Sequence, residues 1–370
     1  MRGHQGPIAV VLGTRPEIIK LGHVIRLLGS RTEIVHTGQH YDAGLSGVFF
    51  TAFGIEEPAT SIAIGGKTRG EQIGTGTAAL TELFARMRPR AVVVQGDTNS
   101  TLAAALAANA QDIPLIHVEA GLRSHDRAMP EEHNRVLTDH LADLCLAPTE
   151  VSHANLVSEG IPEGRIRVTG NTVVEAVTDL LPEETERESI VTNHGLTRER
   201  FVLSTFHRPE NVDDPDRFAA ILQELHGISM PVVLPLHPRS RARLAEHDLE
   251  HLIAGITVIE PVGYREFLAL LAEAAMAVGD SGGVQEEVSV LKRPMIVVRR
   301  STERPEVMGT FARLCPAGDG LADMANEWLT DLAETLRTLG DIPSPYGDGS
   351  ASERSVAAID ELLARDDSAH

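Results

Sequence analysis

The feature that most constrains the fold is a regular alternation of short apolar segments with longer amphipathic ones. Residues 7–13 form an apolar run of strand length, and a helical pattern follows at 18–28. The same succession recurs, with predicted strands at 33–36, 91–95, 113–118, 144–147 and 166–168 and predicted helices at 44–53, 70–87, 101–110 and from 130, 150 and 172. Apolar, β-branched strands that alternate with helices are typical of a parallel sheet covered on both faces.

A second series of the same kind begins near residue 201. Its predicted strands are 201–205, 231–235, 257–260, 275–278 and 295–298, and its predicted helices are 215–226, from 240, 264–274 and 284–291. Residues 181–200 are charged and poor in apolar side chains, which favours a linker. At about 100 to 200 residues per domain, we expect two Rossmann-like α/β domains, 1–182 and 183–349, that face a cleft. A separate amphipathic helix is predicted over 350–366.

The charge balance narrows the classes of partner. The chain has 33 Lys and Arg against 53 Asp and Glu, a formal net charge of -20, which disfavours nucleic acid and anionic membranes as main partners. No apolar run approaches the roughly 18 residues of a membrane span, and no signal-peptide pattern is present, so we expect a cytoplasmic protein. Cys145 and Cys315 lie in apolar contexts far apart in the sequence, which predicts two buried thiols.

Carboxylates stand at the ends of two neighbouring predicted strands. Asp97 follows one strand and Glu119 follows the next, while Glu131 and Glu132 open a later helix. Neighbouring parallel strands end at the same edge of a sheet, so we expect Asp97 and Glu119 to lie near each other. Closely placed carboxylates push their pKa values apart and can divide acid from base work. The structural alternatives are that Asp97 caps the next helix and that Glu131 only complements a helix dipole.

Two strand-to-helix turns are suited to bind an anion. Arg15 follows the first strand and precedes a helix N-terminus, where a phosphate is favoured. In the second domain, Ser281, Gly282 and Gly283 join a strand to a helix, and their backbone N–H groups and hydroxyl suit a phosphate in the same way. Glu286 and Glu287, a turn further on, offer a carboxylate for ribose hydroxyls. The pattern therefore indicates a diphosphate clamp.

Several histidines follow predicted strands. In the second domain, His207 with Arg208, and His237 one strand later, are expected to face the cleft. In the first domain, His117, His125 and His133 crowd the region of Glu119 and Glu132, which raises a metal site as an alternative. Their spacing lacks the compact His-Glu-x-x-His arrangement and they fall on strand, loop and helix, so we expect no metal. A serine hydrolase is disfavoured because the chain has no Gly-x-Ser-x-Gly elbow.

Together these motifs resemble those of the non-hydrolysing UDP-N-acetylglucosamine 2-epimerases. The matching blocks are Gly-Thr-Arg-Pro-Glu at 13–17 with Lys20, Gly-Gln-His at 38–40, Gly-Asp-Thr at 96–98, His-Val-Glu-Ala-Gly-Leu-Arg at 117–123, Pro-Glu-Glu at 130–132 with Asn134 and Arg135, Thr-Gly-Asn-Thr at 169–172, His-Arg-Pro-Glu-Asn at 207–211, Asp-Ser-Gly-Gly-Val-Gln-Glu-Glu at 280–287 and Thr-Glu-Arg-Pro-Glu at 302–306. The resemblance implies a glycosyltransferase-B fold, a C-terminal helix that crosses back to the first domain, and a homodimer.

The resemblance also implies the reaction. Members of the family invert C2 of UDP-GlcNAc to give UDP-ManNAc, without metal or nicotinamide, by eliminating UDP to 2-acetamidoglucal and adding it back. By position, the catalytic acids would be Asp97, Glu119 and Glu131, with His207 assisting the departing diphosphate. The substrate-binding positions would be Arg15, Ser281, Gly282 and Gly283 for the phosphates, Glu287 for the ribose, Phe267 for the uracil, and Lys20, Arg135, Arg208, His237, Glu303 and Arg304 for the rest of the cleft.

One departure from the family concerns a second, activating site for UDP-GlcNAc. Many bacterial members carry a further glutamine after Gly-Gln-His, where this chain has Asp42 within the run 40–44. Gln39 and His40 remain as candidate second-site residues. Because Asp42 removes amide donors and adds negative charge, we expect weak or absent activation by substrate.

Three other functions are kept as alternatives. A hydrolysing 2-epimerase would share the elimination but release free ManNAc and UDP. A UDP-sugar glycosyltransferase of the same fold would have an acceptor groove and little need for three carboxylates together. A nucleotide-sugar sensor would bind without exchanging the C2 proton.

Overall fold

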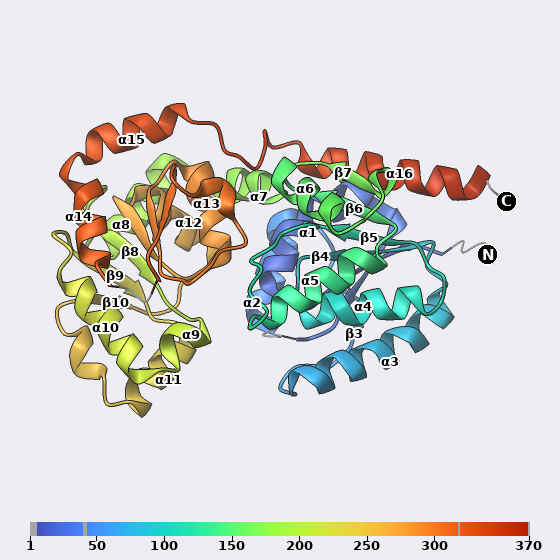
Figure 1. The fold of residues 1–370 in the computed structure, drawn as a ribbon, viewed down its shortest axis with the longest axis horizontal. Coiled ribbons are helices and arrows are strands. Elements are labelled where there is room, and N and C mark those ends of the chain that lie inside the picture. Colours follow the sequence, from blue (N-terminus) through green and yellow to red (C-terminus); the bar gives the residue numbers. More distant parts are fainter. Residues whose placement is uncertain (1–5, 40–42, 317–318, 369–370) are drawn as a thin grey trace. The chain divides into compact units, whose positions relative to one another are not determined.

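The computed structural model describes residues 6–39, 43–316 and 319–368. The chain divides into two compact units, one made of residues 1–176 and 346–370 and the other of residues 177–345. Figure 1 shows both as α/β units. The change from the first unit to the second falls within helix α7 (Val173–Leu180), ahead of the sequence-based boundary at residue 182.

The first unit contains a seven-stranded sheet in the order β3-β2-β1-β4-β5-β6-β7, and all of its ladders are parallel. Its strands are β1 (Ile8–Leu12), β2 (Thr32–His36), β3 (Thr60–Ser61), β4 (Ala91–Gln95), β5 (Leu115–Val118), β6 (Leu144–Ala147) and β7 (Ile166–Val168). Its helices before α7 are α1 (Arg15–Leu28), α2 (Ala43–Phe53), α3 (Arg69–Met87), α4 (Asn99–Asn109), α5 (Pro130–Leu141) and α6 (Glu150–Ser158).

Small side chains bring α4 close to the sheet. Ala103, Ala104 and Ala107 of α4 are fully buried in one core cluster with Val92 and Val94 of β4. An alanine-rich face carries no long side chain, so the helix packs directly on the strands. This packing fixes the turn between β4 and α4, where Asp97 stands.

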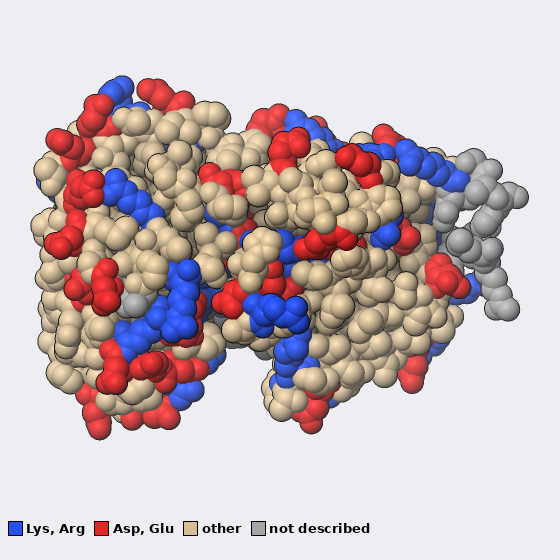
Figure 2. All heavy atoms as spheres, in the orientation of Figure 1, with Lys and Arg blue, Asp and Glu red and all other residues tan. Residues whose placement is uncertain are grey.

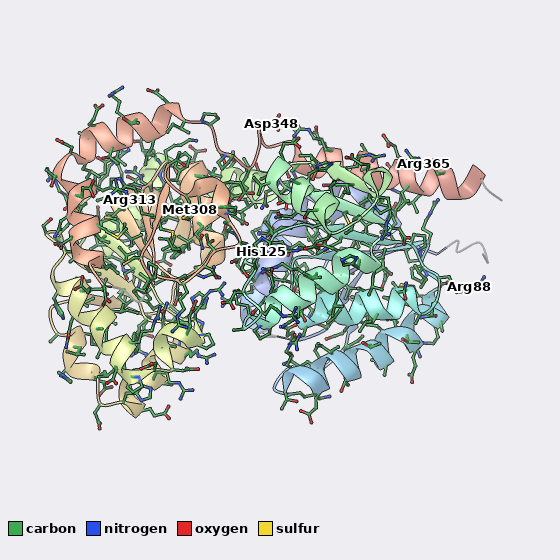
Figure 3. All side chains as sticks on the ribbon, viewed as in Figure 1. Arg88, His125, Met308, Arg313, Asp348 and Arg365 are labelled. Carbon is green, nitrogen blue, oxygen red and sulfur yellow. The ribbon has the colours of Figure 1, made fainter. Side chains whose placement is uncertain are left out.

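The last helix, α16 (Ala351–Ser368), belongs to the first unit, as the resemblance implies. It contacts α1 and buries Ile359 and Leu363 (Figure 1). Asp348, in the segment that leads into α16, pairs with Arg354 at 2.6 Å (Figure 3). At the start of the helix, the backbone N–H of Ser352 donates to Glu175 at 2.8 Å.

The second unit contains a six-stranded parallel sheet in the order β10-β9-β8-β11-β12-β13. Its strands are β8 (Val202–Thr205), β9 (Val232–Pro235), β10 (Thr257–Ile259), β11 (Met276–Gly279), β12 (Met295–Val297) and β13 (Ala312–Leu314). Its helices are α8 (Glu184–Asn193), α9 (Pro209–Val212), α10 (Pro215–His226), α11 (Pro238–Glu246), α12 (Tyr264–Glu273), α13 (Gly282–Leu291), α14 (Leu321–Thr330) and α15 (Leu332–Asp341).

The prediction of a linker over residues 181–200 is wrong. Residues 184–193 form α8, which contacts α12 of the second unit. Arg187 Nε lies 2.6 Å from the buried carboxylate of Glu273, and Val191 is buried. Ion pairs with α12 thus stabilise a helix whose own sequence contains little apolar surface.

The prediction of two parallel α/β sheets is confirmed. The sequence patterns did not indicate β13, α14 and α15, which close one edge of the second unit. There the guanidinium of Arg313, labelled in Figure 3, lies 4.5 Å from the ring centroid of Trp328. Both cysteines are buried and neither forms a disulfide, as predicted.

No helix among the described residues is long and apolar enough to cross a membrane. On the face shown in Figure 2, Asp and Glu side chains are interspersed with Lys and Arg in both units. This mixed surface accompanies the net charge of -20.

Candidate functional site

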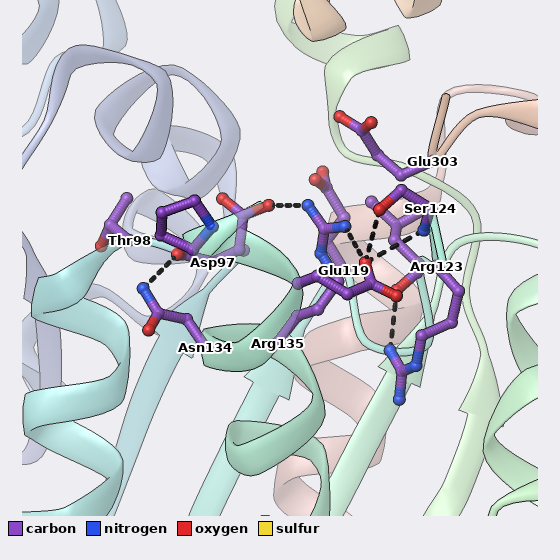
Figure 4. Close-up of polar contacts among 12 residues, drawn as sticks. Asp97, Thr98, Glu119, Arg123, Ser124, Asn134, Arg135 and Glu303 are labelled. Atoms are coloured by element: carbon purple, nitrogen blue, oxygen red, sulfur yellow. Dashed lines mark hydrogen bonds and ion pairs between the residues drawn. The ribbon is translucent and has the colours of Figure 1, made fainter. Parts of the chain in front are cut away.

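Asp97 stands at the carboxyl edge of the first sheet, in the turn between β4 and α4. It does not cap α4, because Thr98 does so: the Thr98 hydroxyl accepts a hydrogen bond from the N–H of Thr101 at 3.1 Å. The Asp97 carboxylate instead pairs with the guanidinium of Arg135 on α5 (Figure 4). Asn134 holds the same turn by donating to the Asp97 carbonyl at 2.9 Å. With its side chain 31% exposed, Asp97 remains accessible to a ligand.

Arg135 also binds Glu132, one turn earlier on α5, with Nη1 and Oε2 2.6 Å apart. Glu132 in turn accepts hydrogen bonds from the backbone N–H groups of Ser124 and His125 at 3.0 and 2.9 Å. Burial alone would raise the pKa of Glu132, but the Ser124 N–H and the charge of Arg135 outweigh it and hold that pKa below its ordinary value. Glu132 is therefore ionised at neutral pH and holds Arg135 next to Asp97.

Glu119 follows β5, the neighbour of β4, and is almost fully buried. Its backbone is in the left-handed region, with φ +67°, which is uncommon for a residue with a long side chain. Its carboxylate pairs with Lys20 of α1, and Asn171 donates to it at 3.3 Å. Lys20, which was predicted to bind substrate, therefore neutralises the charge of Glu119, one of the predicted catalytic acids.

Glu131 lies in the first turn of α5 and is half-buried. Within the described ranges, no hydrogen bond or ion pair engages its side chain, in contrast to Glu132 beside it. The structure thus brings Asp97 and Glu119 to adjacent strand ends and Glu131 to the helix that carries Arg135. A half-buried carboxylate without a cation partner is suited to exchange a proton with a ligand.

The turn after β1 is organised by Glu17 rather than by Arg15. Glu17 is buried and accepts hydrogen bonds from the Gly13 N–H at 2.9 Å and from the hydroxyls of Thr14 and Thr98 at 2.8 and 2.9 Å. Burial raises its pKa, against the effect of these hydrogen bonds. Thr14 stands at the N-cap position of α1, but its hydroxyl donates to Glu17 and caps no backbone N–H group. Arg15 is exposed and available to an anion.

Of the two second-site candidates, His40 lies outside the described residues, as does Asp42. Gln39 is engaged in the first unit: its amide oxygen accepts hydrogen bonds from the backbone N–H and the hydroxyl of Ser100, both at 2.9 Å. This contact ties the segment after β2 to the start of α4.

In the second unit, Asp280 organises the carboxyl edge between β8 and β11. The carboxylate is fully buried and accepts hydrogen bonds from the backbone N–H of Arg208 and from the amide of Asn211, both at 3.0 Å. His207 Nδ1 lies 3.2 Å from the same carboxylate. Burial would raise the pKa of Asp280, but the hydrogen bond and charge of His207 and the Arg208 N–H hold it below its ordinary value. The anion of Asp280 thus orients the His207 ring.

His207 and His237 lie together at the ends of β8 and β9. Their ring centroids are 5.5 Å apart, and the side chain of His207 is 39% exposed. His237 also begins α11, since its Nδ1 accepts a hydrogen bond from the N–H of Arg239 at 3.2 Å. The predicted grouping of the two histidines is therefore present in the second unit.

The turn of Ser281, Gly282 and Gly283 leads from β11 into α13, with Ser281 at the N-cap position. The hydroxyl of Ser281 caps none of the helix N–H groups. Beneath the turn, Arg304 pairs with Glu303 and with Glu286, the latter at 2.7 Å between Nε and Oε1. A helix N-terminus with an unused hydroxyl is suited to a phosphate.

Glu287 of α13 is contacted by a residue of α12, the helix that also carries Phe267. The hydroxyl of Tyr264, on α12, donates to Glu287 Oε1 at 2.8 Å, and Phe267 is half-buried one turn later on the same helix. Burial raises the pKa of Tyr264 well above its ordinary value, and the charge of Glu287 adds to this effect. Tyr264 therefore stays a donor to Glu287 at neutral pH.

Gly282→Ala is expected to destabilise the free protein. A Cβ at Gly282 would lie 2.8 Å from Arg304 Nη1 and 3.0 Å from Glu303 Oε1, and these buried side chains cannot move without breaking their ion pairs. We expect a cost of about 1–3 kcal/mol, measured by thermal unfolding without ligand. Gly283→Ala is the matched control, because its Cβ would meet only Glu287 Oε1, at 3.7 Å. Equal melting temperatures for the two variants would contradict this account.

Several residues that shape the site were absent from the predicted set. These are Glu17, His117, Glu132, Asp139, Asn171, Asn211, Tyr264 and Asp280. One signal for His117 was present in the sequence, namely a polar residue inside an otherwise apolar strand. Its ring nitrogens lie 2.6 Å from Asp139 Oδ1 and 2.8 Å from the Gly96 carbonyl, so neither is available to a metal. In the described part of the chain, no group of three or more His, Cys, Asp or Glu side chains could hold a metal ion.

The fold and the two sheet edges define a two-domain α/β protein with acids at the carboxyl edge of one parallel sheet and a helix N-terminus suited to an anion at that of the other. Comparison with known proteins makes the assignment specific. The sequence model of the family described as UDP-N-acetylglucosamine 2-epimerase matches residues 28–360, and the chain belongs to this family.

Individual relatives match over almost their whole length. The UDP-N-acetylglucosamine 2-epimerase of Methanocaldococcus jannaschii is 40% identical, over 95% of this chain and 98% of that protein. A crystal structure of the UDP-GlcNAc 2-epimerase from the same organism, in complex with UDP-GlcNAc and UDP, matches with a TM-score of 0.84 and 39% identity, over 96% of this chain and 99% of that one. The UDP-2,3-diacetamido-2,3-dideoxy-D-glucuronate 2-epimerase of Pseudomonas aeruginosa is 36% identical, over 97% and 99% of the two chains.

Proposed function

We propose that the protein is a non-hydrolysing UDP-GlcNAc 2-epimerase that interconverts UDP-GlcNAc and UDP-ManNAc. The observation that carries the proposal is the set of acids at one sheet edge, Asp97, Glu119 and Glu131, in a chain of this family. The resemblance also supports a homodimer and a cytoplasmic location. The solved M. jannaschii relative in complex with UDP-GlcNAc and UDP supports the same substrate class.

The first unit supplies the proton chemistry. A carboxylate takes the C2 proton while the bond between C1 and the β-phosphate oxygen breaks. The electron pair of this C1–O bond leaves with UDP, and the C2–H electrons form the new C1–C2 bond. The remaining sugar is 2-acetamidoglucal, with a C1–C2 double bond. In the return step, an acid delivers a proton to the other face of C2 and the UDP oxygen adds to C1. Asp97, Glu119 and Glu131 divide these two proton transfers.

Lys20 and Arg135 act on the catalytic acids. Their cations pair with Glu119 and Asp97 and hold both carboxylates in position. If Asp97 or Glu119 takes the proton from C2, its partner cation, Arg135 or Lys20, remains beside it. Glu131, which has no such partner among the described residues, is the third acid of the set.

The second unit binds the nucleotide diphosphate and stabilises it as it leaves. Ser281, Gly282 and Gly283 hold the phosphates at the α13 N-terminus. Charge develops on the β-phosphate as C1–O breaks, and a donor aimed at it lowers the barrier. His207 fills this role, oriented by Asp280.

The remaining positions bind the rest of the substrate. Glu287, which Tyr264 orients, accepts the ribose hydroxyls, and Phe267 contacts the uracil. Arg208 and His237 stand beside His207 at the same sheet edge. Glu303 and Arg304 support the phosphate turn from below and do not require direct contact with substrate.

The product decides between the two epimerase reactions. Incubation with UDP-GlcNAc in deuterated water, followed by NMR, should give UDP-ManNAc with deuterium at C2 and recovered UDP-GlcNAc that is also labelled. Free ManNAc with UDP would assign a hydrolysing 2-epimerase. Binding without deuterium exchange would assign a sensor, and transfer of the sugar to an added acceptor would assign a glycosyltransferase.

The P. aeruginosa relative favours one second candidate, a 2-epimerase of UDP-2,3-diacetamido-2,3-dideoxy-D-glucuronate. That sugar carries an acetamido group at C3 and a carboxylate at C6, and inversion at its C2 needs the same proton transfers. We expect kcat/KM to be higher for UDP-GlcNAc when the two substrates are compared side by side. The reverse order would assign the protein to the diacetamido sugar.

The second-site expectation has its own test. Initial rates over a range of UDP-GlcNAc concentrations should follow a hyperbola if Asp42 weakens an activating site. Sigmoidal rates, or a reverse reaction that starts only after traces of UDP-GlcNAc are added, would show that the activating site is intact.

A further inference from the structure

A buried chain of hydrogen bonds connects the backbone beside Asp97 to the backbone beside Glu119. His117 Nε2 lies 2.8 Å from the carbonyl of Gly96, the residue before Asp97. His117 Nδ1 lies 2.6 Å from Asp139 Oδ1 on α5. The other oxygen of Asp139 accepts a hydrogen bond from the N–H of Gly121, two residues after Glu119, at 3.2 Å.

We propose that His117 and Asp139 are positioning residues for the epimerase reaction, and that His117 is held as an imidazolium that locks the two acid-bearing turns together. The proposal rests on the proposed function for its effect on rate. It goes beyond that function by assigning a role to two buried residues that touch no substrate.

The positive charge follows from the two partners of the ring. A backbone carbonyl only accepts, so Nε2 of His117 must carry a proton to bond the Gly96 oxygen. Nδ1 faces the Asp139 carboxylate. Arg123, whose Nη1 lies 2.8 Å from Asp139 Oδ2, and the Gly121 N–H both favour the Asp139 anion, which only accepts hydrogen bonds, so Nδ1 is also a donor.

The surrounding charges balance this imidazolium. Arg123 Nη1 lies 2.8 Å from the second oxygen of Asp139, and Arg123 makes a two-pronged contact with Glu159 at 2.7 and 2.6 Å. The group therefore contains two cations and two anions. Three of its side chains, those of His117, Asp139 and Arg123, are at most 1% exposed. A buried, balanced network of this kind retains its geometry because breaking any one bond leaves an uncompensated charge.

The two turns need such support because their backbones are unusual. Gly96, Glu119 and Gly121 all have positive φ angles, of 69°, 67° and 85°. Glu119 pays a steric cost in this region, and such conformations persist only where neighbouring contacts impose them. His117 fixes the first of these turns and Asp139 fixes the second. The pair thus sets the separation of two acids that must act on one carbon atom.

A second buried histidine provides a contrast within the same sheet. His36, at the end of β2, accepts a hydrogen bond at Nδ1 from the Gly38 N–H, 3.0 Å away. Burial lowers its pKa, so its ring is neutral at physiological pH. Two fully buried histidines of one sheet should therefore have opposite charge states, which nuclear magnetic resonance can distinguish.

The decisive measurement uses the whole protein with 15N-labelled histidine rings. His117, assigned from the signal lost in His117→Phe, should show two protonated ring nitrogens throughout the neutral pH range, whereas His36 should show one unprotonated nitrogen. In Asp139→Asn, Nδ1 of His117 should lose its proton while Nε2 keeps the bond to Gly96. An unprotonated nitrogen on His117 of the unaltered protein would overturn the proposal, whatever the enzyme activity is.

The kinetic measurement tests the positioning role. For folded His117→Phe we expect kcat of epimerisation to fall about 100-fold, as for misplacement of reacting groups by about 1 Å, with KM and UDP affinity little changed. In Asp139→Asn, kcat should fall less, because the amide can still form hydrogen bonds with His117 and Gly121 and only the negative charge of Asp139 is lost. His153→Phe, the same change on α6, should keep the normal kcat. If either variant at the network is folded and retains full kcat, the positioning role is overturned. If the unaltered protein is inactive, the proposed function is refuted, and the 15N measurement alone then decides whether His117 is an imidazolium.

Discussion

Asp97→Asn should lower kcat for epimerisation and for deuterium exchange at C2 by about 10²–10⁴-fold, the usual contribution of a positioned acid or base. The amide retains an oxygen that can accept the Arg135 hydrogen bond, so the turn keeps its shape. The amide cannot take a proton from C2. We therefore expect KM and the melting temperature to change little.

The matched control is Asp112→Asn, the same chemical change at an exposed position of the first unit. Asp112 has a backbone φ of +54°, a conformation that asparagine tolerates well, so this variant should retain normal kcat. Deuterium exchange by Asp97→Asn at the normal rate would remove Asp97 from the proton transfers. Glu119 and Glu131 would then have to perform both.

Lys20→Met should destabilise the first unit strongly. Lys20 and Glu119 have side chains that are 8% and 6% exposed, and the substitution removes the cation that pairs with this buried carboxylate. Breaking a buried pair from one side costs about 3–5 kcal/mol. For a unit of this size, each kcal/mol lowers the melting temperature by roughly 2–4 °C, so the fall should be easily measured by thermal unfolding.

The double variant Lys20→Met with Glu119→Gln separates stability from chemistry. With both charges removed, the site holds neutral groups of similar size, and most of the lost stability should return. Activity should not return, because Glu119 has been replaced. Lys67→Met is the control, since Lys67 is exposed and its ammonium lies 3.5 Å from a threonine hydroxyl. A double variant that is as unstable as Lys20→Met would show that the ion pair is not the source of the loss.

The parallel sheets were predictable because their strands are buried on both faces and thus appear as short apolar runs. The strand from Ala91 to Gln95 and the helix from Pro215 to His226 were predicted with the bounds that the structure gives. The end of each strand also located Asp97 and Glu119 correctly at one edge. The local hydrophobic pattern was sufficient to predict an element wherever burial alone decides whether the segment is a strand or a helix.

Pairing over long sequence distances could not be predicted. Lys20 lies 99 residues from Glu119, and His207 lies 73 residues from Asp280, so no local spacing connects them. Asp280 was noted only within the matching block at 280–287, whereas its buried carboxylate fixes the end of the neighbouring strand β8. The helix α8 was missed for a related reason, since its stability comes from partners on α12 such as Glu273.

The return of α16 to the first unit has a consequence for biosynthesis. Residues 177–345 leave the ribosome between α7 and α16, and at about 5–20 residues per second this takes of the order of ten seconds or more. During that interval, the part of α1 that α16 covers has no partner from its own unit. The first unit therefore cannot finish folding until α16 has been synthesised, and the second unit has time to fold before then.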